Sequence, residues 1–96
     1  MPWESDRPAD RNAAADAARI GMLSLALHDA PGALPWLQRA LADNPQDVGV
    51  LSAMADAQLQ TGDPAAARLT LNRAIALDPS NRQVLTLDRR IRKAGA

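Results

Sequence analysis

The side chains that could carry out chemistry are few and are not spaced to work together. His28 is the only histidine among the 96 residues, and the chain has no cysteine. The lack of cysteine excludes disulfides, thiol catalysis and thiolate metal sites, and one histidine without an acid cluster does not complete a metal site. Ser24 and Ser52 lie in helix-forming segments where no histidine is available as a base, which excludes a nucleophilic triad.

The remaining candidates fit structural roles at the ends of helices. His28 stands in a break between two helical segments, where histidine tolerates a left-handed backbone better than most residues do. Asp43 and Asp47 flank a proline turn and are expected to be helix-terminal residues rather than an acid–base pair. The sequence also has no glycine-rich phosphate-binding loop. We therefore expect a protein that is not an enzyme and that needs no cofactor or metal.

Helix formers dominate the chain, and apolar residues recur at intervals of three and four residues, as on one face of a helix. Prolines and glycines divide it into five expected helices, at residues 9–27, 33–43, 48–61, 64–77 and 81–93. Pro35 would disrupt a helix beyond its first turn, so the second helix is expected to start late or to bend at its entrance. No segment alternates as a β-strand does. The predicted fold class is therefore all-α.

Local signals indicate where these helices begin and end. Asp47 is a suitable N-cap, and Asp63 followed by Pro64 is a paired start signal. Gly62 supplies a left-handed stop for the helix before it. Residues 80–83 have the spacing of a capping box, in which Ser80 would cap the last helix.

The chain also repeats itself at a fixed period. Shifting residues 16–47 onto residues 50–81 places identical residue types together at Leu25 and Leu59, Asp29 and Asp63, Ala33 and Ala67, Leu37 and Leu71, Arg39 and Arg73, Ala40 and Ala74, Ala42 and Ala76, and Pro45 and Pro79. A fixed period of this length indicates a stacked supersecondary unit, because one unit cannot bury its apolar face alone. Such an architecture favours a binding scaffold.

This pattern resembles the tetratricopeptide repeat, whose 34-residue signature is W-x2-L-G-x2-Y, then A-x3-F, then P. In the first copy these slots hold Ala17, Ile20, Gly21, Ser24, Ala33, Leu37 and Pro45, and in the second Leu51, Met54, Ala55, Gln58, Ala67, Leu71 and Pro79. The small-residue and proline slots are kept, whereas the aromatic slots are not. The missing aromatic residues weaken the match to the family's helix packing but not to its helix order. Other paired-helix arrays or an alanine-rich bundle are the alternatives.

The resemblance implies a right-handed helical-hairpin repeat of two helix pairs plus a C-terminal capping helix. On this interpretation residues 9–81 form the two repeats, and residues 82–96 are similar to the extra helix that often seals the last repeat. Residues 1–8 contain two prolines and little apolar content, so they are expected to form a flexible N-terminal tail.

In this family the first helix of each pair lines a concave groove, and the resemblance implies that peptides bind there. The expected groove residues are Ala15, Ala18, Arg19, Met22, Gly49, Ser52, Ala53, Asp56, Gln83, Thr86, Leu87 and Arg90. They would form a shallow surface of small residues, one methionine and charges of both signs. The alternative is that these side chains are only solvated, with alanine present for its helix propensity.

Members of the family that hold the acidic C-termini of chaperones clamp carboxylates with Lys, Asn and Arg in this groove. The matching positions here are Ala18, Met22, Ala53, Gln83 and Leu87. None of these side chains is a cation, so a chaperone-tail binder with a carboxylate clamp is disfavoured.

Charge is unevenly distributed although the formal net charge is zero. From Arg82 onward five basic residues face one acid, Asp88, which gives +4 and leaves −4 on the part of the chain before Arg82. A basic end can bind nucleic acid, but cations also complement the C-terminus of a helix, and no aromatic residues are interleaved for base stacking. Nucleic-acid binding is therefore disfavoured, whereas the basic end could attract the acidic part of a second copy in a homodimer.

The sequence thus predicts a non-catalytic protein–protein interaction module, a scaffold or adaptor that binds a peptide or partner protein on its concave face. One alternative is a self-associating structural unit, because two repeats are fewer than the roughly three usually needed for stability. Another is a docking segment of a larger protein, with a composition compatible with a bacterial source. No apolar run approaches the ~20 residues that span a bilayer, and no secretory signal is evident, so a cytoplasmic location is the default expectation.

Overall fold

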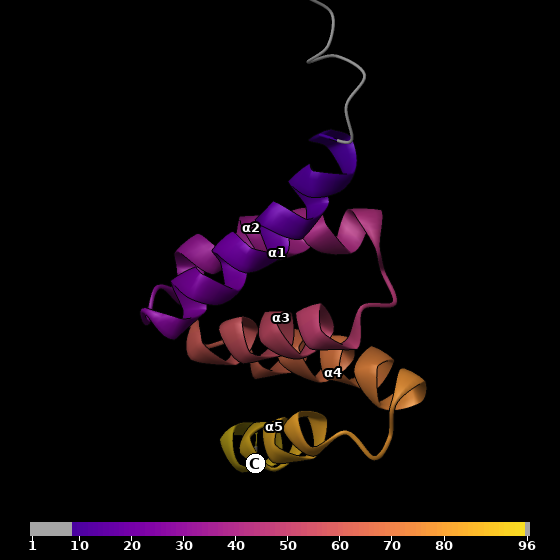
Figure 1. Ribbon diagram of the computed structural model, residues 1–96. Helices are drawn as coiled ribbons and strands as arrows, with labels where there is room; N and C mark the ends of the chain where they lie inside the picture. The colour runs from indigo at the N-terminus through magenta and orange to yellow at the C-terminus, as the bar shows by residue number, and fades with distance from the viewer. Residues whose placement is uncertain (1–8, 96) are drawn as a thin grey trace, which may run out of the picture.

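The computed structural model describes residues 9–95, which contain five α-helices and no β-strand. These are α1 (Ala9–Ala26), α2 (Ala30–Asp43), α3 (Val48–Gln60), α4 (Pro64–Leu77) and α5 (Arg82–Gly95). Helix α1 packs on α2 and α3 on α4, and the two pairs and α5 stack in chain order (Figure 1). The chain is therefore an all-α helical-hairpin repeat, as predicted. The expected tail, residues 1–8, lies outside the described residues.

The second helix of each pair starts with the same aspartate cap. An Oδ1 oxygen of Asp29 accepts a hydrogen bond from the Gly32 N–H at 3.0 Å, and Asp63 accepts one from the Ala66 N–H at 3.1 Å. These bonds satisfy backbone N–H groups that have no partner within the helix. Asp47 caps α3 in the same way, with the Val50 N–H at 3.2 Å. The predicted caps Asp47 and Asp63 are confirmed.

Helix α2 begins at Ala30, ahead of the start predicted at Ala33. The prediction was wrong because Pro31 falls in the first turn, where the N–H that proline lacks would have no helical partner anyway. Pro35 then lies inside the helix, and its missing hydrogen bond is the one to the carbonyl of Pro31. The loss is thus confined to the entrance, and the helix continues to Asp43.

The start of α5 also differs from the prediction. Asn81, and not Ser80, is the capping residue, because its Oδ1 accepts a hydrogen bond from the Val84 N–H at 3.1 Å. The Asn81 amide also donates to Asp78 Oδ2 at 3.3 Å, whereas the Ser80 hydroxyl lies 3.5 Å from Asp78 Oδ1. Asparagine is among the preferred capping residues, and here it links the end of α4 to the start of α5.

Two hydrophobic clusters hold the stack together, and α3 contributes to both. The first joins α1, α2 and α3 through Ala17, Ala30, Ala33, Leu37, Ala40, Val50, Ala53, Met54 and Ala57. The second joins α3, α4 and α5 through Leu51, Ala55, Ala67, Leu71, Ala74, Val84, Leu87 and Ile91. Leu41 packs against both clusters. Because the core is mostly alanine and leucine, the helices can lie close together.

Gly21 shows how close this approach is. A Cβ atom at this position would lie 2.7 Å from Cγ and Cδ2 of Leu37, a residue that is fully buried in α2. Contacts at that distance require the Leu37 side chain or one of the two helices to shift. Gly21 occupies the glycine slot of the repeat signature, so the contact between α1 and α2 accounts for a small residue there.

The turns that end α1 and α3 have the same geometry. His28 (φ 64°) and Gly62 (φ 85°) both adopt the left-handed conformation and occupy equivalent positions of the two repeats. In the first turn the Asp29 N–H donates to the Ser24 carbonyl at 2.8 Å, and in the second the Asp63 N–H donates to the Gln58 carbonyl at 2.9 Å. These are the hydrogen bonds of a Schellman motif. The left-handed turns predicted at both residues are confirmed.

These paired turns allow a direct test of backbone strain. Gly62→Ala should lower the free energy of unfolding by roughly 1–2 kcal/mol, because a left-handed conformation is strained for a residue with a Cβ. No atom lies within 4 Å of the added methyl group, so steric contact adds nothing. His28→Gly should change stability by less than about 0.5 kcal/mol, since relief of strain offsets the added freedom of the unfolded chain. Chemical denaturation followed by circular dichroism measures both, and an equal loss in both variants would contradict this explanation.

Candidate ligand-binding groove

The first helices of the stack, α1, α3 and α5, enclose two adjoining hollows. The first has a volume of about 320 Å³ and is lined by Met22, Leu25, Ala26, Gly49, Ala53, Asp56 and Gln83. The second has a volume of about 440 Å³ and is lined by Asp56, Arg82, Gln83, Thr86, Leu87 and Arg90. Asp56 and Gln83 line both hollows. We refer to the two together as the groove.

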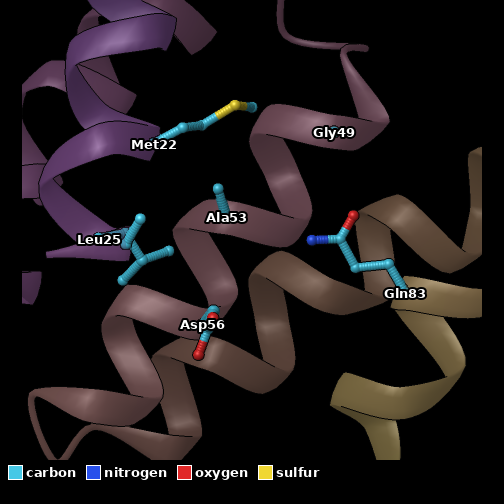
Figure 2. A pocket seen from close by; sticks show the side chains of 7 residues that line it. Met22, Leu25, Gly49, Ala53, Asp56 and Gln83 are labelled. Atoms are coloured by element: carbon cyan, nitrogen blue, oxygen red, sulfur yellow. The ribbon is translucent and has the colours of Figure 1, made fainter. Parts of the chain in front are cut away.

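The first hollow is mainly apolar. Figure 2 shows Met22 and Leu25 on α1 facing Ala53 on α3, with the Gln83 amide approaching from α5. Gly49 is exposed and Ala53 is buried, so the two small residues form the base of this hollow on α3. Asp56 supplies the only charge in this hollow. A hollow of this composition suits an apolar side chain flanked by polar backbone groups.

The second hollow carries charges of both signs. Asp56 Oδ1 pairs with Arg90 Nη2 at 3.1 Å and also accepts a hydrogen bond from Gln60 Nε2 at 3.0 Å. Arg82 lines the hollow as well and makes no ion pair with the described residues. Two guanidinium groups therefore face one carboxylate, so this half of the groove has a positive balance.

Helix α5 is held in place by both apolar contacts and ion pairs. Val84, Leu87 and Ile91 are buried in the second cluster. Asp88 pairs with Arg68 of α4, at 2.6 Å to Nη1, and with Arg92 of its own helix, at 3.0 Å to Nε. The Asp88 side chain is only 14% exposed, so it is better shielded from solvent than a typical surface ion pair. The walls of the second hollow are thus fixed against α3 and α4.

The hollows bring together most of the groove residues that the sequence predicts: Met22, Gly49, Ala53, Asp56, Gln83, Thr86, Leu87 and Arg90. Ala53 and Leu87 lie at the base of the hollows and are buried in the core clusters, so the prediction that they form open groove surface was wrong. Arg19 is exposed but lines neither hollow, and Ala18 is half-buried against the first core cluster. The side chain of Ala15 lies outside the described residues. Leu25, Ala26 and Arg82 were missed, although Leu25 and Ala26 follow Met22 by three and four residues and so share its helical face.

Ser52 does not contribute to the groove surface, contrary to the prediction. It is fully buried, and its hydroxyl has no hydrogen-bond partner among the described residues. Around the axis of α3, Ser52 lies between Asp56 on one side and Leu51 and Ala55 on the other. Leu51 and Ala55 form the face that packs against α4 and α5. Ser52 therefore belongs to the buried part of α3 and not to the groove surface.

The described residues contain no group of three or more histidine, cysteine, aspartate or glutamate residues placed to hold a metal ion. His28 is exposed in the turn between α1 and α2, away from both hollows. None of the helices within residues 9–95 is both long enough and apolar enough to span a membrane.

The buried hydroxyl of Ser52 leads to a prediction about stability. Ser52→Ala should raise the free energy of unfolding by about 1 kcal/mol, because it removes a buried polar group that has no partner. Thr70 is the matched control, since it is also buried but donates to Gln58 Oε1 at 2.7 Å. Thr70→Val should lower stability by about 1 kcal/mol. Urea denaturation measures both changes, and destabilisation by Ser52→Ala would show that the hydroxyl is satisfied.

Comparison with known proteins agrees with this architecture. The family model described as tetratricopeptide repeat matches residues 24–91, which include both turns and most of the groove. Neither the search of curated proteins nor the search of solved structures gave a significant match. Because the family model covers well over half of the sequence, the chain belongs to the tetratricopeptide repeat family.

Proposed function

We propose that this chain is a non-catalytic interaction module, a scaffold or adaptor that binds a peptide or a partner protein in the groove between α1, α3 and α5. Tetratricopeptide repeats are in general protein-interaction folds. The observation that carries the proposal is that two adjoining hollows share Asp56 and Gln83, which makes one continuous surface across three helices. The proposal applies equally if the chain acts as a docking segment within a longer protein.

The composition of the groove fits an extended peptide. An apolar side chain of the ligand would contact Met22, Leu25 and Ala53 in the first hollow. Gln83 and Asp56 could then form hydrogen bonds to the peptide backbone at the point where the hollows meet. The volume of each hollow lies within the range of about 300–1,000 Å³ that ligand sites usually have.

Two other binding functions receive less support. A carboxylate clamp would need Lys, Asn and Arg at the positions of Ala18, Met22, Ala53, Gln83 and Leu87, none of which holds such a residue, and Ala53 and Leu87 are in addition buried. A nucleic-acid site at the basic end would need aromatic side chains for base stacking, which this end lacks, and two of its five cations, Arg90 and Arg92, pair with Asp56 and Asp88. Both observations favour a peptide or protein ligand.

A substitution in the apolar hollow tests the proposal. Peptides would first be selected from a displayed random library on the full chain. Met22→Glu should then weaken the selected peptides at least tenfold, or about 1.4 kcal/mol, because a ligand's apolar side chain would have to desolvate the new carboxylate. Leu77→Glu is the matched control, since Leu77 is similarly exposed (43% against 38%) but lines neither hollow.

Isothermal titration calorimetry gives the dissociation constants, and circular dichroism checks that both variants stay helical. Failure to select any peptide, or equal weakening by Met22→Glu and Leu77→Glu, would contradict binding in the groove.

A further inference from the structure

Helix α1 carries a second surface that the groove does not use. Ile20, Leu23 and Leu27 are 39%, 61% and 70% exposed. Their spacing of three and four residues places them on one stripe of the helix. None of the three lines either hollow, and none belongs to a core cluster. We call Ile20, Leu23 and Leu27 the α1 stripe.

The repeat period shows which face of a repeat the α1 stripe corresponds to. A shift of one full period places Ile20 and Leu23 on Met54 and Ala57 of α3. Met54 and Ala57 are almost fully buried in the first cluster, where α3 packs against the α1–α2 pair. Ile20 and Leu23 therefore lie on the face by which the first helix of a repeat packs against the pair before it, and Leu27, whose counterpart Thr61 is exposed, extends the stripe just beyond the end of α1. No described residue precedes α1 to cover it.

The opposite end of the stack differs in chemistry. The positions of α5 that correspond to Leu51, Ala55 and Gln58 of α3 hold Leu85, Arg89 and Arg92. Ala55 is fully buried, whereas Arg89 is exposed and would have to be desolvated by any helix packed on it. Within the described part of the chain, the packing face at the α5 end thus carries two arginines beside Leu85, which is 44% exposed, whereas Ile20 and Leu23 keep the α1 end apolar at the positions of Met54 and Ala57.

The difference between the α1 and α5 ends indicates how two copies of the chain would associate. A head-to-tail assembly of copies would bury the α1 stripe against the charged α5 end, and would form an open array rather than a closed complex. A contact between two α1 ends buries apolar surface against apolar surface and closes as a twofold dimer. We propose that two copies of this chain associate through their α1 stripes, with the two α1 helices antiparallel.

Charge supports the antiparallel arrangement. Helix α1 has no basic residue in its last turn, where the negative end of the helix dipole favours a cation. Arg19 is exposed and makes no ion pair with the described residues. A twofold axis between Ile20 and Leu23 would bring Arg19 of each copy close to the last turn of the partner's α1. Each copy would then supply the missing cation to the other.

The test compares oligomeric state by sedimentation equilibrium over a wide concentration range. The wild-type chain should be a dimer that dissociates on dilution. Leu23→Glu should raise the dissociation constant at least tenfold, because the twofold axis brings the two carboxylates together. Leu69→Glu is the matched control, as Leu69 is 69% exposed on α4 and should leave the dimer unchanged. Arg19→Ala should weaken the dimer several-fold, and only at low salt.

Circular dichroism shows whether Leu23→Glu remains helical, as its exposure leads us to expect. Met22→Glu separates the stripe from the groove, since it should leave the dimer intact. A wild-type chain that is monomeric at every concentration would overturn the proposal, whether or not another protein covers the stripe. A dimer that resists Leu23→Glu, or that Leu69→Glu or Met22→Glu dissociates, would overturn it as well.

Discussion

The structure depends on one helix having two buried faces. Val50, Met54 and Ala57 of α3 pack on the α1–α2 pair, while Leu51 and Ala55 pack against α4 and α5. A helix that is apolar over so much of its circumference cannot remain in water, so it holds its neighbours together. The strip that remains uncovered includes Gly49 and Asp56, at the floor of the groove. The groove is thus a consequence of how α3 is buried.

Asp56 links this packing to the proposed binding site. Its carboxylate lies at the junction of the hollows, where it pairs with Arg90 and accepts a hydrogen bond from Gln60. The Arg90 side chain is 47% exposed, and exposed ion pairs contribute only about 0–1 kcal/mol to stability. A ligand that carries either charge could replace one partner at little loss to the fold. Asp88, which is less exposed, keeps α5 in place independently of this exchange.

The fold could be predicted from the sequence because the same caps and turns occur at equivalent positions of the two repeats. Asp29 and Asp63 cap helices in the same way, and His28 and Gly62 turn the chain in the same way, so each copy supports the interpretation of the other. The errors arose where local signals compete. Ser80 and Asn81 are both good caps, and only the contact with Asp78 favours Asn81. In the groove, Met22 and Asp56 line the hollows, but the spacing of residues along α3 could not show that the packed stack buries Ser52.

The same requirement for two buried faces explains why α1 differs from α3. Both are first helices of a repeat, and both carry apolar residues on the face that points toward a preceding pair. In α3 that face is satisfied within the chain, whereas in α1 it is exposed at Leu23 and Leu27. Met22 and Leu25 lie on a different side of α1, in the groove. Association through the stripe would therefore give α1 its second buried face and leave the groove open to a ligand.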